Sequence, residues 1–267
     1  MRIVAFAVAG LIMLLALPLG AAQSSPARSL VWEIEEGLYF AGNALGMLRT
    51  INEVDRVSSI NYTGTGTALA GGKPCTLASY KAGVNYLRFS GMRVDFTCEG
   101  SPTRYIQVVS GDYAWNEKEP GVGAEPAPET LRERQLLLYM LPHGAYKAAT
   151  AAGPDLKLSK EGAATVWTFP LGEVGDKTKI KFGGTMRVAL DRDYRPARVE
   201  AKVGNLAMDA TYSEYGDWNG DDYLSDVMFP KRIVLRRNGT EVLNLTVTKT
   251  NTYNPYLIMP VPASLKK

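Results

Sequence analysis

The chain has 267 residues, of which 46% are apolar and 21% are charged, and its formal net charge is +3. This composition belongs to a folded protein with a sizeable core, and it excludes disordered and collagen-like chains. The 30 basic and 27 acidic residues are interspersed without a basic stripe or cluster, so we expect no nucleic-acid partner. The length fits one or two domains, because all-β folds often use about 200–250 residues as a single domain.

Residues 1–22 have the pattern of a secretory signal peptide. Arg2 is followed by an almost unbroken apolar run up to Leu19, and small residues then lead to a cleavage site expected after Ala22. A retained membrane anchor is the alternative, but the run is short for a span of about 20 residues. We therefore expect an exported, periplasmic protein without a transmembrane span in the mature chain, in which residues 23–267 form one domain.

Cys75 and Cys98 are the only cysteines in the sequence. An even number of cysteines in an exported protein favours a disulfide, whereas a metal site would need further soft ligands. A hairpin that turns at Gly83 and Val84 would place Cys75 opposite residue 92 rather than Cys98. The expected bond would then join neighbouring strands, or a strand end and a loop.

The apolar periodicity predicts two helices. Residues 30–54 carry apolar side chains at spacings of three and four, namely Ile34, Leu38, Ala41, Leu45, Leu48 and Ile51. Residues 129–141 form the second helix after a loop rich in proline and glycine. Pro142 cannot continue that helix, and a short alanine-rich helix is expected to resume at Ala145.

Most of the remaining chain alternates between apolar and polar residues, which is typical of half-buried strands. Strands are expected over 57–67, 76–81, 85–98 and 104–115, and only strands are expected after Thr165. Asn238 and Gly239 form a two-residue hairpin signal. The sequence therefore predicts an α+β, mainly β, fold in which about 9–11 antiparallel strands form one long curved sheet around two helices.

The sequence lacks the common catalytic patterns. His143 is the only histidine; it would be a base or metal ligand in one interpretation and, in the favoured one, a helix-break residue that satisfies a freed carbonyl. No Gly-x-Ser-x-Gly, phosphate-loop, dinucleotide or zinc-protease motif is present, so we expect no enzyme, no cofactor and no metal. Residues 217–222 resemble half of a calcium loop, but Asp222 and Met228 stand where glycine and glutamate are required, which favours a polar turn.

Aromatic and leucine-rich segments are the candidates for a ligand site. The residues that we expect at a cavity or its lid are Leu136, Leu137, Met140 and Leu141 of the second helix, together with Trp115 and Trp167. The alternative for each of them is ordinary packing between helix and sheet or within the sheet.

Three stretches of the chain resemble a known family. They are residues 106–116, residues 134–149 around Pro142-His143-Gly144, and the final pattern of Tyr212-Ser213-Glu214-Tyr215, Phe229-Pro230-Lys231-Arg232-Ile233 and residues 243–248. These stretches and the layout of one helix, a long strand meander and a helical insertion resemble the LolA-like superfamily of periplasmic lipoprotein carriers, which includes LppX/LprG-like lipid binders. The resemblance implies an unclosed half-barrel with helices as a lid and a cavity for acyl chains.

A curved sheet of this size presents a wide apolar inner face that two helices cover incompletely, and the remaining hollow would be apolar. The first functional hypothesis is therefore an exported carrier for a hydrophobic ligand, a lipid or the acyl chains of a lipoprotein. The alternative is a cell-envelope protein–protein interaction module with a filled interior and an envelope protein as its partner. A hydrolase is the least favoured alternative, because His143 has no histidine partner.

Overall fold

The computed structural model describes residues 26–48, 57–87, 89–175, 179–218, 227–252 and 257–266, with side chains from Glu33 onward. The predicted signal peptide and residues 219–222 of the calcium-like loop lie outside these ranges. Among the residues that are described, none of the helices has the length and apolar character needed to cross a membrane.

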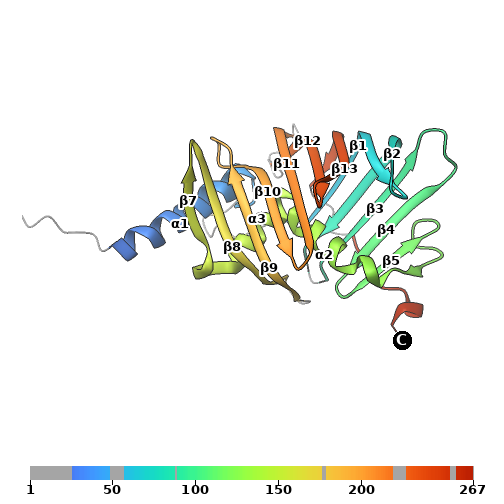
Figure 1. Cartoon of the computed structure of the whole chain (residues 1–267), viewed down its shortest axis with the longest axis horizontal. Coiled ribbons are helices and arrows are strands. Elements are labelled where there is room, and N and C mark those ends of the chain that lie inside the picture. The colour runs from blue at the N-terminus through green and yellow to red at the C-terminus, as the bar shows by residue number, and fades with distance from the viewer. Residues whose placement is uncertain are drawn as a thin grey trace, which may run out of the picture.

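In the described part of the chain, one antiparallel sheet of thirteen strands forms the body of the structure (Figure 1). The strands are β1 (Ser59–Ala70), β2 (Lys73–Asn85), β3 (Gly91–Cys98), β4 (Arg104–Ser110), β5 (Tyr113–Glu117), β6 (Glu125–Pro126), β7 (Lys157–Glu161), β8 (Ala164–Val174), β9 (Ile180–Leu190), β10 (Pro196–Val203), β11 (Leu206–Asp217), β12 (Met228–Arg237) and β13 (Thr240–Asn251). Their order is β6-β5-β4-β3-β2-β1-β13-β12-β11-β10-β9-β8-β7, so two meanders are joined by the pairing of β1 with β13. The predicted fold class is confirmed, with thirteen strands where about 9–11 were expected.

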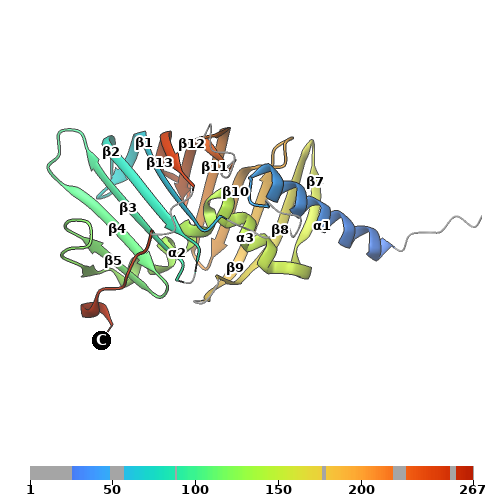
Figure 2. The ribbon, with the colours of Figure 1, turned by 180° about the vertical axis from the view of Figure 1, so that it is seen from behind.

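The three α-helices found among the described residues cover one face of the sheet, which we call the inner face (Figures 1 and 2). They are α1 (Pro26–Ala44), α2 (Leu131–Met140) and α3 (Pro142–Ala152), and short 3₁₀ turns lie at Pro128–Thr130, Gly153–Asp155 and Ala263–Leu265. Figure 2 shows α1 and α3 across the β7–β10 half of the sheet, and α3 contacts β8 and β10. The sheet forms a curved wall, and the helices pack against its inner face.

Several predicted boundaries are wrong for local reasons. The first helix ends at Ala44 instead of extending to residue 54, because Gly46 takes a φ of 71° and turns the chain. The expected strand over 104–115 is two strands, because Gly111, with a φ of 54°, opens a turn between β4 and β5. The Asn238–Gly239 hairpin is confirmed, with φ values of 48° and 81°.

Helix α2 contacts strands from both halves of the sheet, which shows how strongly the sheet curves. On one side, the buried Arg134 guanidinium donates to the carbonyl of Val108 at 3.1 Å and to that of Trp115 at 2.6 Å. On the other side, Arg132 donates to the carbonyl of Lys181 in β9 at 2.5 Å. The sheet therefore wraps around α2 as the predicted half-barrel does.

The C-terminal segment covers the opposite face of the β3–β5 end, which we call the outer face. Asn85 donates to the carbonyl of Leu257 at 2.5 Å and holds the segment to the end of β2. Apolar side chains of this segment pack in a separate small core, which contains Ile106, Val108, Trp115, Leu257, Met259, Val261 and Leu265. The two faces of this end of the sheet are therefore buried by different parts of the chain.

The disulfide between Cys75 and Cys98 is confirmed, with a Cα–Cα distance of 5.7 Å. It joins the neighbouring strands β2 and β3, and Cys98 pairs in register with Leu77 rather than with Cys75. The turn that we expected at Gly83 and Val84 is wrong, because β2 continues to Asn85 and the chain turns afterwards.

We predict that replacing both cysteines, Cys75→Ala with Cys98→Ala, lowers the free energy of unfolding by about 3 kcal/mol, because the bond restricts the unfolded chain. Urea denaturation of the two proteins under non-reducing conditions measures the difference. A reducing agent should lower the stability of the native protein by a similar amount and leave the double variant unchanged. Equal midpoints for the native protein and the double variant would contradict this account.

Candidate functional site

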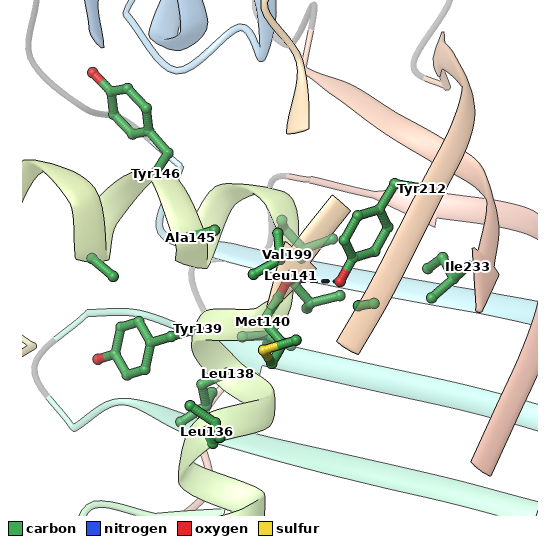
Figure 3. Close-up of a cluster of buried hydrophobic side chains, with 14 of the residues drawn as sticks. Leu136, Leu138, Tyr139, Met140, Leu141, Ala145, Tyr146, Val199, Tyr212 and Ile233 are labelled. Carbon is green, nitrogen blue, oxygen red and sulfur yellow. Dashed lines mark hydrogen bonds between the residues drawn. The ribbon is translucent and has the colours of Figure 1, made fainter. Parts of the chain in front are cut away.

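A cavity of about 150 Å³ lies between α2 and the inner face of the sheet. Its lining is mostly apolar and comes from strands β1–β4 and β11–β13 as well as from α2. The lining residues are Tyr62, Ala68, Leu69, Tyr80, Met92, Val94, Phe96, Gln107, Glu133, Leu137, Met140, Leu141, Tyr212, Ile233, Leu235, Arg237, Val242 and Leu243. Figure 3 shows Met140 and Leu141 beside Tyr212 and Ile233. An apolar wall with a few polar groups is the usual character of a ligand site.

A continuous row of aromatic rings crosses the inner face at this cavity. Ring centroids lie 5.1 Å apart between Phe229 and Tyr62, 6.0 Å between Tyr62 and Tyr80, 6.5 Å between Tyr80 and Phe96, and 4.9 Å between Phe96 and Tyr105. The register explains the row, because Tyr80 pairs with Phe96 and Phe96 pairs with Tyr105 across adjacent strands. Tyr62, Tyr80 and Phe96 of this row line the cavity.

An ion pair stands at the polar side of the cavity lining. Arg237, near the end of β12, donates to both carboxylate oxygens of Glu133 in α2 at 2.9 Å. Both side chains are partly exposed, and Gln107 of β4 adds an uncharged polar group to the lining. The two charges compensate each other, so the pair leaves this part of the lining without net charge.

The break between α2 and α3 shapes the helical side of the cavity. Pro142 has no N–H, so the carbonyl of Leu138 cannot receive its usual helical hydrogen bond. The Tyr86 hydroxyl donates to that carbonyl at 3.0 Å, and the Tyr212 hydroxyl donates to the Met140 carbonyl at 2.6 Å (Figure 3). Tyr86, which directly follows β2, and Tyr212 of β11 thus hold the end of α2 by donating to its freed carbonyls.

The tyrosines of the cavity wall are neutral in the folded protein. Burial raises the pKa of Tyr62 to about 12 and raises the pKa of Tyr80 and of Tyr212 well above the ordinary value. The hydroxyls of Tyr62 and Tyr80 interact with each other. The wall therefore offers uncharged hydroxyl groups within an apolar surface.

Of the six residues that the sequence suggested for the cavity, three line it and three do not. Leu137, Met140 and Leu141 line it, whereas Leu136 is fully buried in the core away from the lining. Trp115 lies under the C-terminal segment on the outer face, where its indole donates to Glu117 at 2.9 Å. Trp167 lies in the core close to Gly37 of α1.

Sequence reasoning missed Tyr62, Tyr80, Phe96, Glu133 and Arg237. The alternation in β1–β3 already marks Tyr62, Tyr80 and Phe96 as residues of one face. The ion pair has no comparable signal, because 104 residues separate its partners.

His143 is fully buried, which agrees with the structural interpretation, but it does not serve the freed carbonyls. Tyrosines serve them instead, and the His143 ring stacks on Phe229 with the ring centroids 6.0 Å apart. Burial lowers the pKa of His143 to about 3, and the charge of Lys147 acts in the same direction. His143 is therefore neutral in the folded protein near neutral pH.

Comparisons with known proteins returned structural likeness only. No protein-family model matches the sequence, and no curated protein matches it significantly. Among solved structures, the chain is similar to a LolA superfamily protein from Nitrosomonas europaea, with 14% identity, a TM-score of 0.42, and coverage of 85% of this chain and 97% of that chain. It is also similar to an uncharacterised conserved protein from Thermus thermophilus, with 14% identity, a TM-score of 0.30, and coverage of 88% and 93%.

Identities and TM-scores of this size carry no information about the ligand or the function.

We predict that His143 makes the protein less stable below pH 6.5. A histidine in the unfolded chain titrates near pH 6.5, whereas His143 in the folded chain titrates near pH 3. The unfolded state therefore binds a proton that the folded state lacks, and the free energy of unfolding falls by about 1.4 kcal/mol per pH unit in this window.

The His143→Phe variant, which keeps an aromatic ring against Phe229, should lose this part of the slope. Urea denaturation of both proteins between pH 6.5 and pH 5 measures the difference. No other histidine is present to obscure the result. Parallel stability curves for the native protein and the variant would show that His143 does not titrate as described.

Proposed function

We propose that this protein is an exported, periplasmic binding or carrier protein that shelters a hydrophobic ligand, a lipid or the acyl chains of a lipoprotein. The observation that carries the proposal is the apolar cavity between α2 and the inner face, lined by residues from seven strands and one helix. A binding role without catalysis fits a cavity whose polar groups are neutral tyrosines, a glutamine and a compensated ion pair.

The disulfide supports the exported location. Disulfides persist in oxidising compartments such as the periplasm and are rare in the reducing cytosol. The bond between Cys75 and Cys98 therefore agrees with the signal peptide that we expect over residues 1–22.

The volume of the cavity limits what can enter it in the present conformation. At about 150 Å³ it is smaller than the roughly 300–1,000 Å³ of most ligand pockets. A long acyl chain would therefore require α2 to move away from the wall. The side of the helical segment that faces the sheet carries Leu137, Met140 and Leu141. The Glu133–Arg237 ion pair also joins α2 to the sheet, so it would have to break or follow the movement.

A substitution that fills the cavity tests the proposal. Ile233 lines the cavity, whereas its neighbour Val234 lies on the other face of the same strand. We expect Ile233→Trp to lower the affinity for a fluorescent fatty acid at least about tenfold, because the indole occupies the ligand volume, and Val234→Trp to leave the affinity unchanged.

Fluorescence titration of the native protein and both variants measures these affinities. Mass spectrometry of an organic-solvent extract of the purified native protein is the companion measurement, and it should find a co-purified lipid. A native protein that contains no lipid and fails to bind the fluorescent fatty acid would overturn the carrier proposal.

An envelope interaction module is the second candidate, and one observation favours it. Leu87, Phe89 and Ile258 are 51%, 64% and 63% exposed. The hydrogen bond from Asn85 to the carbonyl of Leu257 holds the segment of Ile258 to the end of β2, from which Leu87 and Phe89 follow. A contiguous apolar patch on the surface is a feature of contact sites for other proteins.

A further inference from the structure

We infer that the cavity, in the conformation described here, takes a compact, flat ring with a hydroxyl or carbonyl substituent, such as a phenol or a quinone, in preference to a saturated group of the same size. This inference rests on the proposed binding function and names the chemical class that the same cavity selects. It follows from the volume of the cavity, from the rings in its wall and from the hydroxyl groups between them.

The volume matches a single ring. A closed apolar cavity of about 150 Å³ in a protein core takes up benzene, so this volume holds one six-membered ring without any movement of the surrounding structure. The cavity described here has a volume of about 150 Å³. A ring can therefore enter the present conformation, whereas a long saturated chain requires a different one.

The wall favours a flat ring over other ligands of the same volume. Aromatic rings attract one another in stacked or edge-on arrangements at centroid distances of about 4.5–7 Å, beyond what their buried area contributes. Tyr62, Tyr80 and Phe96 stand 6.0 Å and 6.5 Å apart along one wall of the cavity. A flat ring placed against this wall extends the row, and a puckered saturated ring does not.

The hydroxyl groups of the wall explain the expected substituent. Tyr62 and Tyr80 are buried and neutral, and their hydroxyls bond to each other, so the pair keeps one O–H donor and free acceptor lone pairs for an uncharged oxygen of a ligand. The Tyr212 hydroxyl is already engaged with the carbonyl of Met140. A phenol or quinone oxygen near Tyr62 and Tyr80 therefore finds a polar partner, and a hydrocarbon leaves that partner unused.

The test compares two ligands of the same skeleton, p-cresol and 4-methylcyclohexanol, by titration of the native protein followed by NMR. We expect p-cresol to bind at least about fivefold more tightly, because only its flat ring stacks on the wall. Tyr80→Leu and Phe96→Leu, which remove rings but keep apolar bulk, should reduce this preference to about twofold or less. Leu235→Met, which changes a non-aromatic lining residue, should leave it unchanged.

Decanoic acid is included as a third probe, so that the two proposals can fail separately. Equal binding of p-cresol and 4-methylcyclohexanol, or a preference that survives both leucine variants, overturns the ring inference, and binding of decanoic acid would then preserve the carrier proposal. Failure of all three probes to bind the native protein overturns both. If a leucine variant does not fold, NOEs from bound p-cresol to Tyr80 and Phe96 of the native protein decide, and their absence overturns the inference.

Discussion

The missing N–H of Pro142 is the constraint on which the arrangement of the cavity depends. A helix that continued past this residue would run α2 and α3 as one straight rod, which could not follow a curved sheet. The break allows α2 to contact β3, β4 and β11 while α3 packs on β8. The carbonyls that the break leaves free accept from Tyr86, which directly follows β2, and from Tyr212 of β11, so the break also holds the helices against the sheet.

The polar anchors of α2 explain why a hollow remains beside it. Arg134 is buried without a described carboxylate partner, and it donates to two carbonyls and to the side chain of Asn116. Burial lowers its pKa to about 10, which leaves it charged and bound to these acceptors at neutral pH. Together with Arg132 and Tyr212 these bonds set the distance of α2 from the strands. Side chains of the size of Leu137 and Met140 do not fill that distance completely.

The sequence predicts those strands of which one side faces solvent. The alternation around Val199, Ala201, Met208 and Ala210 identifies strands because their outer neighbours are polar. The turn at Gly111 escapes prediction, since apolar residues continue on both of its sides and both faces of β4 are buried. The two faces are buried by different elements, one of them the C-terminal segment. A local sequence pattern cannot indicate burial by a segment that is distant in the sequence.

The candidate site was predictable only in part, for a related reason. The leucines of α2 form a local cluster, which indicated three of the lining residues. The position of Trp115 depends on which face the C-terminal segment covers, and the position of Trp167 depends on where α1 packs. Four rings of the aromatic row, at residues 62, 80, 96 and 105, become neighbours only through the register of four strands. The register in which the strands pair, rather than their composition, creates the aromatic row.

The two faces of the sheet differ in chemistry, and under the proposed function this difference would direct an apolar ligand to the inner face. On the outer face of the β7–β11 half, Arg187 bonds to Glu161 and Glu200, and Arg198 bonds to Asp209 at 3.0 Å. Such a ladder of charges is hydrated, and an apolar ligand would have to displace its water. The inner face presents neutral side chains around the cavity, and the Glu133–Arg237 pair adds no net charge to them. An uncharged ligand can therefore enter the cavity without separating a buried charge from its partner.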